Sequence, residues 1–168
     1  MFADCTSLTS GPSILPSTRL YDRCYYGMFI RCSSLTSAPE LSAITLESMC
    51  CQSMFNSCSS LSSAPLILPA TTLATSCYKY MFQDCISLTR APELPAASLV
   101  SACYGGMFQR CRNLTYIKAL FTTAPSTTYT SSWVEGVASA GTFVKKSNAT
   151  WNVTGVNGVP NGWTIQRA

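Results

Sequence analysis

Histidine is absent from this 168-residue sequence, and charged residues make up only 11% of it. Without histidine, the chain lacks the usual general base of enzymes and the usual partner of a nucleophilic serine or cysteine. Mixed Cys/His zinc sites are excluded as well, and the sequence contains no Cys-x-x-Cys pair. We therefore expect no enzymatic activity, no cofactor and no metal site.

Long apolar runs are also missing, because none approaches the roughly 20 residues that a membrane span needs. Basic residues are few and scattered: the net charge is +4, and Lys145-Lys146 is the only adjacent basic pair. Nucleic-acid surfaces need clustered Lys and Arg. We thus expect neither membrane insertion nor a nucleic-acid partner. Serine and threonine supply most of the surface polarity, which favours an extracellular or virion protein over a cytosolic one.

The sequence does contain a repeat. Met-Phe recurs at positions 1, 28, 54, 81 and 107, at intervals of 27, 26, 27 and 26 residues. A Cys follows each Met by four positions and a Leu by seven, and a Pro follows by eleven in the first four copies. One such unit cannot bury its own apolar face and must stack on its neighbours, so the period predicts a solenoid. Because Met1 is already in register, we expect no signal peptide and a chain that begins within the solenoid of a longer protein.

The spacing within a unit indicates its local structure. Leu73, Cys77, Met81 and Cys85 recur at every fourth position, which is typical of the apolar face of a helix. Glycines interrupt this stretch in other copies, so we expect two short helical turns per repeat. The Ser-Leu-Thr-x-Ala-Pro segment that follows predicts a brief strand in a parallel sheet. The Leu that stands eight residues before the next Met follows the Pro by eight residues in the first and third units and by seven in the second and fourth. This variation in length predicts a loop between the Pro and that Leu.

The ten cysteines are numerous enough for disulfides in an extracellular protein, but their spacing argues against bridges. Cys77 and Cys85 are eight residues apart, about 12 Å along a helix, which exceeds the ~7 Å Cα limit for a bridge. We expect nine of the ten to be buried thiols that pack as small apolar side chains. Cys51 stands where other copies have Tyr, and it either replaces a packing ring or is a more exposed thiol.

The pattern Met-Phe-x-x-Cys-x-Ser-Leu-Thr-x-Ala-Pro, followed by Leu-Pro-Ala and Leu-x-x-x-Cys-Tyr, resembles the BspA-like leucine-rich-repeat surface proteins of bacteria and their phages. The resemblance covers residues 1 to about 120. It implies an α/β solenoid, a right-handed coil with short parallel strands on one wall and short helical turns on the other. It also implies adhesion or partner binding at a bacterial cell surface or on a phage virion. The family shares no catalytic residues, so none is carried over.

The last part of the chain has a different composition. We take residues 1–120 as a solenoid of about 4.5 repeats and residues 121–168 as a small β-rich C-terminal cap. Ser132 and Glu135 fit a capping box, which predicts a helical turn over 133–138. Strands are predicted at 142–145, 151–153 and 163–165, and the fifth repeat predicts a stronger strand around its Tyr-Ile-Lys-Ala. The three tryptophans are the core of the cap or, alternatively, a platform that stacks carbohydrate.

A binding module is the leading functional hypothesis, because the residues that vary between repeats would lie in a row along the sheet. Arg and Tyr in this row are residue types favoured at interface hot spots. The expected partner is a protein or carbohydrate on a host or neighbouring cell; an ordinary solvated sheet face is the alternative. The candidate binding residues are Ser37, Ser63, Arg90, Tyr116, Glu40 and Glu93.

Two other functions are compatible with parts of the sequence. Glu40 and Glu93 lie two repeats apart, roughly 10 Å by strand spacing, and such a pair could serve an inverting glycosidase. Repeat geometry is the simpler explanation. An uncapped first coil would expose strand edges that another copy of the chain could continue, which makes a structural subunit of a fibre, sheath or virion appendage the second hypothesis.

Overall fold

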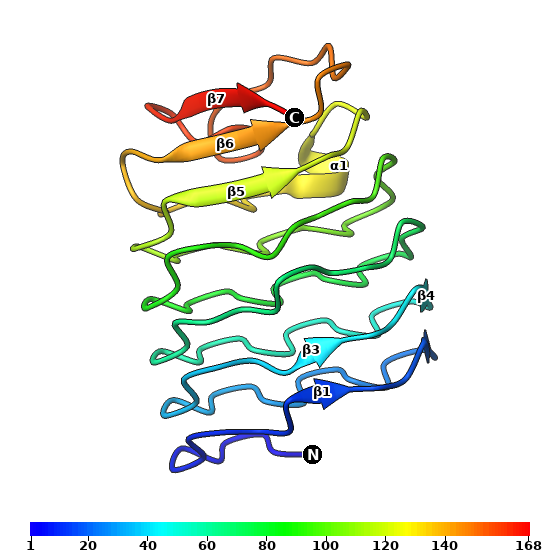
Figure 1. Ribbon diagram of the computed structural model, residues 1–168, viewed down its shortest axis with the longest axis vertical. Helices are drawn as coiled ribbons and strands as arrows, with labels where there is room; N and C mark the ends of the chain where they lie inside the picture. Colours follow the sequence, from blue (N-terminus) through cyan, green and yellow to red (C-terminus); the bar gives the residue numbers. More distant parts are fainter.

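The computed structural model describes all 168 residues and is a parallel β-solenoid of about six turns. Figure 1 shows the coils stacked from the N-terminus at the bottom to the C-terminus at the top. β1 (Ile14–Leu15) pairs in parallel with β3 (Glu40–Leu41), and β2 (Arg19–Leu20) pairs with β4 (Thr45–Leu46). The predicted solenoid is therefore confirmed, and its parallel ladders run along the axis.

The predicted helical turns are wrong. The only helix is α1 (Thr127–Thr130), so no helix is long or apolar enough to cross a membrane. The segments around Met-Phe form a non-helical wall, called here the Met-Phe wall (residues 21–32, 47–58, 74–85 and 100–111). In residues 76–85 the even-numbered N–H groups donate to the next coil, as Phe82 does to Met107, and the odd-numbered ones donate to the residue three positions back. Every N–H of this segment is thus paired without the i→i−4 bonds of a helix.

A left-handed residue at every fourth position makes this wall possible. Ser76, Tyr80 and Asp84 have φ of 55°, 57° and 60°, and equivalent positions of the other coils repeat the pattern. Each left-handed residue donates its own N–H to the neighbouring coil, and so does the residue two positions later, as Tyr80 and Phe82 do. Apolar side chains spaced by four therefore reach the interior here, just as they would on a helix. That shared spacing is why the helical interpretation failed.

The opposite wall is called here the Ala-Pro wall (residues 36–41, 62–68, 89–94 and 115–119), and before its last coil it pairs only through ladders of one or two residues. The Ser-Leu-Thr-x-Ala-Pro segments pair through single bridges, Ser37 with Ser63 and Arg90 with Tyr116. The strand predicted in the fifth repeat is confirmed as β5 (Tyr116–Ala119). The order β5-β6-β7 forms a three-stranded parallel sheet with β6 (Thr142–Lys145) and β7 (Thr164–Arg167).

The interior between the walls is a stack of identical side chains. Five phenylalanines, one from each Met-Phe pair, form a column with ring centroids 5.3–5.8 Å apart. The thiol of Cys85 donates to the carbonyl of Phe55 in the preceding coil at 3.1 Å. Each of the other three thiols in this column also donates to the phenylalanine carbonyl of the coil before its own: Cys32 to Phe2, Cys58 to Phe29 and Cys111 to Phe82. Each coil therefore binds its neighbour through ring stacking, main-chain bonds and sulfur donors together.

All ten cysteines are free thiols, and eight of them are buried. The exposed pair, Cys5 and Cys24, lies at the N-terminal end of the stack, so two of the nine thiols expected to be buried are exposed. Cys51 is fully buried and takes the place of the tyrosine ring, which selects the first of the two alternatives for this residue.

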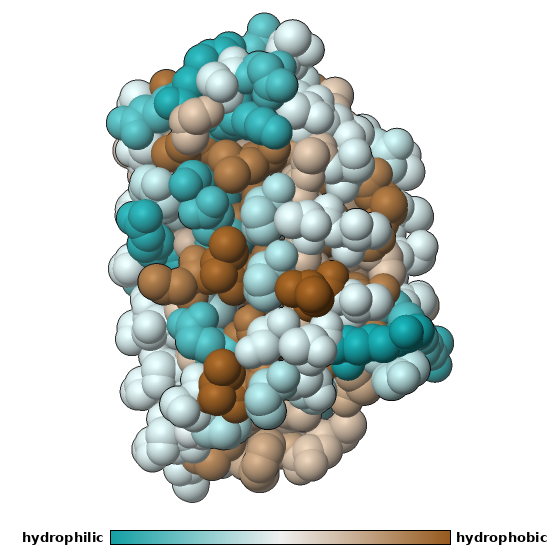
Figure 2. All heavy atoms as spheres, turned by 45° about the vertical axis from the view of Figure 1, so that its right-hand side comes forward, coloured by the Kyte–Doolittle hydropathy of each residue, from teal (hydrophilic) through white to brown (hydrophobic).

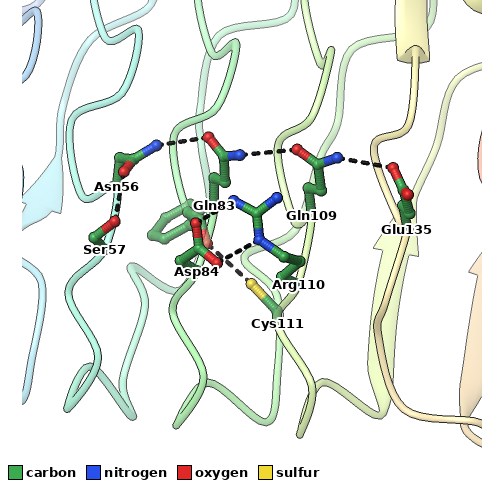
Figure 3. Close-up of polar contacts among 9 residues, drawn as sticks. Asn56, Ser57, Gln83, Asp84, Gln109, Arg110, Cys111 and Glu135 are labelled. Carbon is green, nitrogen blue, oxygen red and sulfur yellow. Dashed lines mark hydrogen bonds and ion pairs between the residues drawn. The ribbon is translucent and has the colours of Figure 1, made fainter.

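Polar side chains also stack on the Met-Phe wall (Figure 3). Amides form a chain from Asn56 to Gln83 (2.7 Å) and from Gln83 to Gln109 (2.8 Å), which ends on the carboxylate of Glu135 at 2.8 Å. Beside it, Arg110 donates two hydrogen bonds of 2.6 Å to Asp84 of the preceding coil. Each donor thus has an acceptor one coil away.

Residues beyond 121 continue the stack. Phe108 donates its N–H to Trp133 at 2.8 Å, and Trp133 takes the next place in the phenylalanine column at 6.1 Å. The helical turn predicted over 133–138 is wrong, because Ser132 has φ of 50° and the helix lies upstream at α1, N-capped by Ser126. The strand at 142–145 is confirmed, the one at 163–165 begins one residue later, and residues 151–153 form no strand.

The tryptophans of this segment are buried, as a core requires. Trp133, Trp151 and Trp163 are at most 7% exposed, and each indole N–H donates to a backbone carbonyl. Lys145 is 1% exposed and donates to the carbonyl of Trp151 at 2.6 Å. With their rings enclosed, the tryptophans form no platform for carbohydrate.

Candidate binding groove

A groove opens on the Ala-Pro wall between the third, fourth and fifth coils. Its volume is about 480 Å³, within the ~300–1,000 Å³ range of small-ligand sites. Four of the six predicted binding residues line it: Ser63, Arg90, Glu93 and Tyr116. The structure therefore brings together residues that the sequence placed in separate repeats.

A step in chain length creates the groove. Between equivalent points of the wall the third coil has six residues (Ser63 to Leu68), the fourth has five (Arg90 to Leu94) and the fifth has four (Tyr116 to Ala119). The third and fourth coils pair only at the far end of this stretch, Ile67 with Glu93, and the additional residue of the third coil bulges outward before that point. Leu66 lies on this bulge and is 68% exposed. The fourth and fifth coils are shorter and do not bulge, and the groove lies beside Leu66 over these two coils.

The backbone ladder is parted inside the groove. No backbone hydrogen bond joins residues 61–65 to residues 88–92, although the coils on either side remain paired there. The N–H groups of Ala64, Thr89 and Arg90 and the carbonyl of Ser62 have no partner in the protein. Main-chain donors left open in this way are available to water or to a ligand.

The charged residues of the groove are held in defined positions. The Arg90 guanidinium lies over the Tyr116 ring, 3.6 Å from its centroid, and its N–H groups make no hydrogen bond to the protein. Lys118, in contrast, pairs with Glu93 at 2.9 Å. The groove thus contains one ion pair and one positive charge without a carboxylate partner.

The two remaining predicted residues lie at the margin. Ser37, on the second coil, pairs with Ser63 of the third coil and does not line the groove. Both carboxylate oxygens of Glu40 accept from the N–H of Leu66, at 3.1 and 3.2 Å. Glu40 therefore fixes the bulge that forms the groove. Glu40 and Glu93 are each engaged by a different partner and face no common cleft.

Several lining residues were missed by the sequence reasoning, chiefly Ser62, Leu66 and Lys118. The length differences after the proline were visible, and they mark the coil that bulges. What they do not show is that three coils of decreasing length follow one another. No group of three or more His, Cys, Asp or Glu side chains is arranged to hold a metal ion.

Comparison with known proteins finds no family model, no curated protein and no solved structure that matches this chain.

Proposed function

We propose that this protein is a non-enzymatic recognition module that binds a partner at a cell surface or on a virion through the groove of the Ala-Pro wall. The observation that carries the proposal is the convergence of Ser63, Arg90, Glu93 and Tyr116, four residues that vary between repeats, in one hollow. Repeat positions that only stack keep their residue type, as the phenylalanines do. Residues that vary between repeats and line a hollow are suited to a binding function. The BspA-like resemblance implies an α/β solenoid with helical turns, and the structure agrees with it only in being a solenoid.

The rest of this wall offers no broad apolar surface for a partner. Figure 2 shows brown residues separated by white and teal ones over the face that it presents. Outside the groove, exposed apolar side chains such as Ile14 (48%) and Ile44 (59%) are next in sequence to a serine or a threonine. Scattered apolar residues of this kind are normal on a protein surface. Polar recognition in the groove is therefore favoured over a large apolar interface.

The test is the double variant Arg90→Ala/Tyr116→Ala, screened with the parent protein on arrays of extracellular proteins and glycans. We expect at least a tenfold loss of binding with an unchanged melting temperature. The matched control is Arg19→Ala/Tyr21→Ala, because Arg19 also lies over a tyrosine ring, 5.0 Å away, outside the groove. Equal binding by the groove variant and the parent would overturn the proposal.

The second hypothesis, assembly of copies through the solenoid ends, stays a proposal. Sedimentation over a concentration series separates it from the recognition module: concentration-dependent polymers support assembly, and a monomer at all concentrations excludes it.

A further inference from the structure

We infer that the groove binds the carboxylate of an acidic saccharide and that Arg90 is the residue that binds it. This inference rests on the proposed function, since it names the ligand class of the same groove. It depends on three observations: the state of the Arg90 guanidinium, the open backbone groups beside it, and the closed ends of the groove.

Arg90 is prepared to bind an anion. Its guanidinium lies 3.6 Å from the Tyr116 ring centroid, and stacking of this kind holds the group flat while leaving its N–H edge free. Four of the other arginines, Arg19, Arg23, Arg31 and Arg110, each pair with a carboxylate. Arg167 donates to two backbone carbonyls, and Arg112, which also has no carboxylate partner, lies outside the groove. Arg90 is the arginine without a carboxylate partner that lines the groove, and a free guanidinium edge matches the two oxygens of a carboxylate in bidentate geometry.

The surroundings of Arg90 suit hydroxyl groups. Ser62 and Ser63 line the groove with exposed side chains, and the N–H groups of Ala64 and Thr89 lack partners. Sugar hydroxyls both donate and accept hydrogen bonds, so one ring can satisfy N–H, carbonyl and serine groups at the same time. The Glu93–Lys118 pair adds a further acceptor and donor.

The ends of the groove argue against a peptide. A peptide that adds a strand needs an open sheet edge along which to run. Here the coils close again on both sides: Ser87 Oγ donates to the carbonyl of Ser59 at 2.7 Å, and the N–H of Glu93 donates to Leu66 at 3.0 Å. The parted ladder is therefore a short hollow within the wall, which fits a compact ring better than an extended chain.

The experiment titrates the isotope-labelled protein with the methyl glycosides of glucuronic acid, galacturonic acid and N-acetylneuraminic acid, and records amide shifts by NMR. Methyl glucoside, methyl galactoside and the peptide Gly-Asp-Gly-Asp-Gly are titrated in parallel. We expect at least one acidic sugar to shift the amides of Ala64, Thr89 and Arg90, with at least tenfold weaker binding by the neutral sugars. Arg90→Ala should abolish the shifts and Arg90→Lys should weaken binding about tenfold, because lysine keeps the charge but not the fork.

The control variant is Arg112→Ala, which removes an exposed arginine outside the groove and should leave the titration unchanged. Equal binding of acidic and neutral sugars, or equal loss in Arg112→Ala, would overturn the role of Arg90. Binding of the peptide alone would overturn the saccharide class while leaving the recognition function in place. If no probe binds but the arrays still show a partner lost in Arg90→Ala/Tyr116→Ala, this inference fails and the proposed function stands.

Discussion

The two walls of the solenoid are built from the same repeat, yet they respond differently to a change in length. On the Met-Phe wall each segment has the same number of residues, and from Ser76 to Asp84 alternate N–H groups reach the next coil without interruption. On the Ala-Pro wall the coils differ by one residue each, and the ladder parts. A segment packed against a dense, dry interior cannot accommodate an inserted residue, whereas an exposed segment accommodates it by bulging outward. The difference separates the part of the molecule that holds the coils together from the part that is free to bind.

The largest expected effect is the loss of the Met-Phe wall at alkaline pH. Burial raises the pKa of the Cys58 thiol from its ordinary 9.0 to about 12 and that of Cys103 to about 11, and it raises the pKa of Cys85 and Cys111 as well. Above pH 9 the unfolded chain loses these protons while the folded chain keeps them, so stability is full below pH 9 and falls as pH rises. Each such thiol costs about 1.4 kcal/mol per pH unit.

Several thiols titrate together, so we expect the protein to unfold between about pH 10 and 11, as measured by circular dichroism. Cys58→Ala removes one of these groups and should make the decline in unfolding free energy with pH shallower. A stability that stays constant from pH 8 to 11 would show that the thiols are accessible to solvent, contrary to the packed interior.

A core substitution gives the next effect. Phe82 is fully buried between Phe55 and Phe108, at 5.5 and 5.8 Å. Phe82→Ala should lower the unfolding free energy by about 3–5 kcal/mol, the usual cost of removing a buried ring. Leu66→Ala on the Ala-Pro wall should change it by less than about 0.5 kcal/mol, since Leu66 is 68% exposed. Urea denaturation measures both, and similar values would erase the distinction between the walls.

Two neighbouring glycines test how tightly the Met-Phe wall is packed. Gly106 has φ of +58°, and a Cβ there would lie 2.3 Å from the ring of Tyr80 in the preceding coil. Gly106→Ala should cost about 1–3 kcal/mol through overpacking. At Gly105 a Cβ would meet nothing nearer than 3.6 Å, so Gly105→Ala should be nearly neutral by thermal melting.

The double variant Tyr80→Ala/Gly106→Ala identifies the source of this cost. Relief of the clash should return the double variant close to the stability of Tyr80→Ala alone. If Gly106→Ala costs the same with and without the ring, backbone strain at the left-handed φ is responsible instead of the contact between coils.

The smallest effect belongs to the exposed ion pairs. Asp84 and Arg110 bond bidentately, with side chains 31% and 46% exposed. Asp84→Asn should cost at most about 1 kcal/mol, and less in high salt. Asp22→Asn, which removes a longer contact of 3.8 Å to Arg23, should have no measurable effect. A cost above about 2 kcal/mol for Asp84→Asn would mean that polar stacking contributes as much as the phenylalanine column.

Some of this structure could be predicted from the sequence because the repeat aligns equivalent residues. The phenylalanine and cysteine columns, the solenoid and β6 follow from the positions of Phe82, Cys85 and Thr142–Lys145. The non-helical turns of the Met-Phe wall could not be predicted. Apolar residues spaced by four fit both a helix and the turns that left-handed Tyr80 and its equivalents produce. A helix bonds within its own segment, whereas these turns need a neighbouring coil.

Four of the residues that line the groove could be predicted from the sequence, but its form could not. Aligning the repeats shows that Arg90 and Tyr116 occupy the same position of successive repeats, which predicts that they are neighbours. The bridge between Arg90 and Tyr116 confirms that they are. The depth of the groove arises from coils of six, five and four residues stacked in that order. Its rim depends on Glu40, whose carboxylate binds the N–H of Leu66 one coil away.

By itself the sequence determined which side chains stack: a period of 26 or 27 residues places each Met, Phe, Cys and Leu of the repeat over its equivalent in the neighbouring coil. The tertiary structure decided how the backbone runs between those columns and where the wall opens. The physical reason is that half of the N–H groups on the Met-Phe wall find their acceptors in the next coil, so the conformation of one coil is settled only when its neighbour is in place.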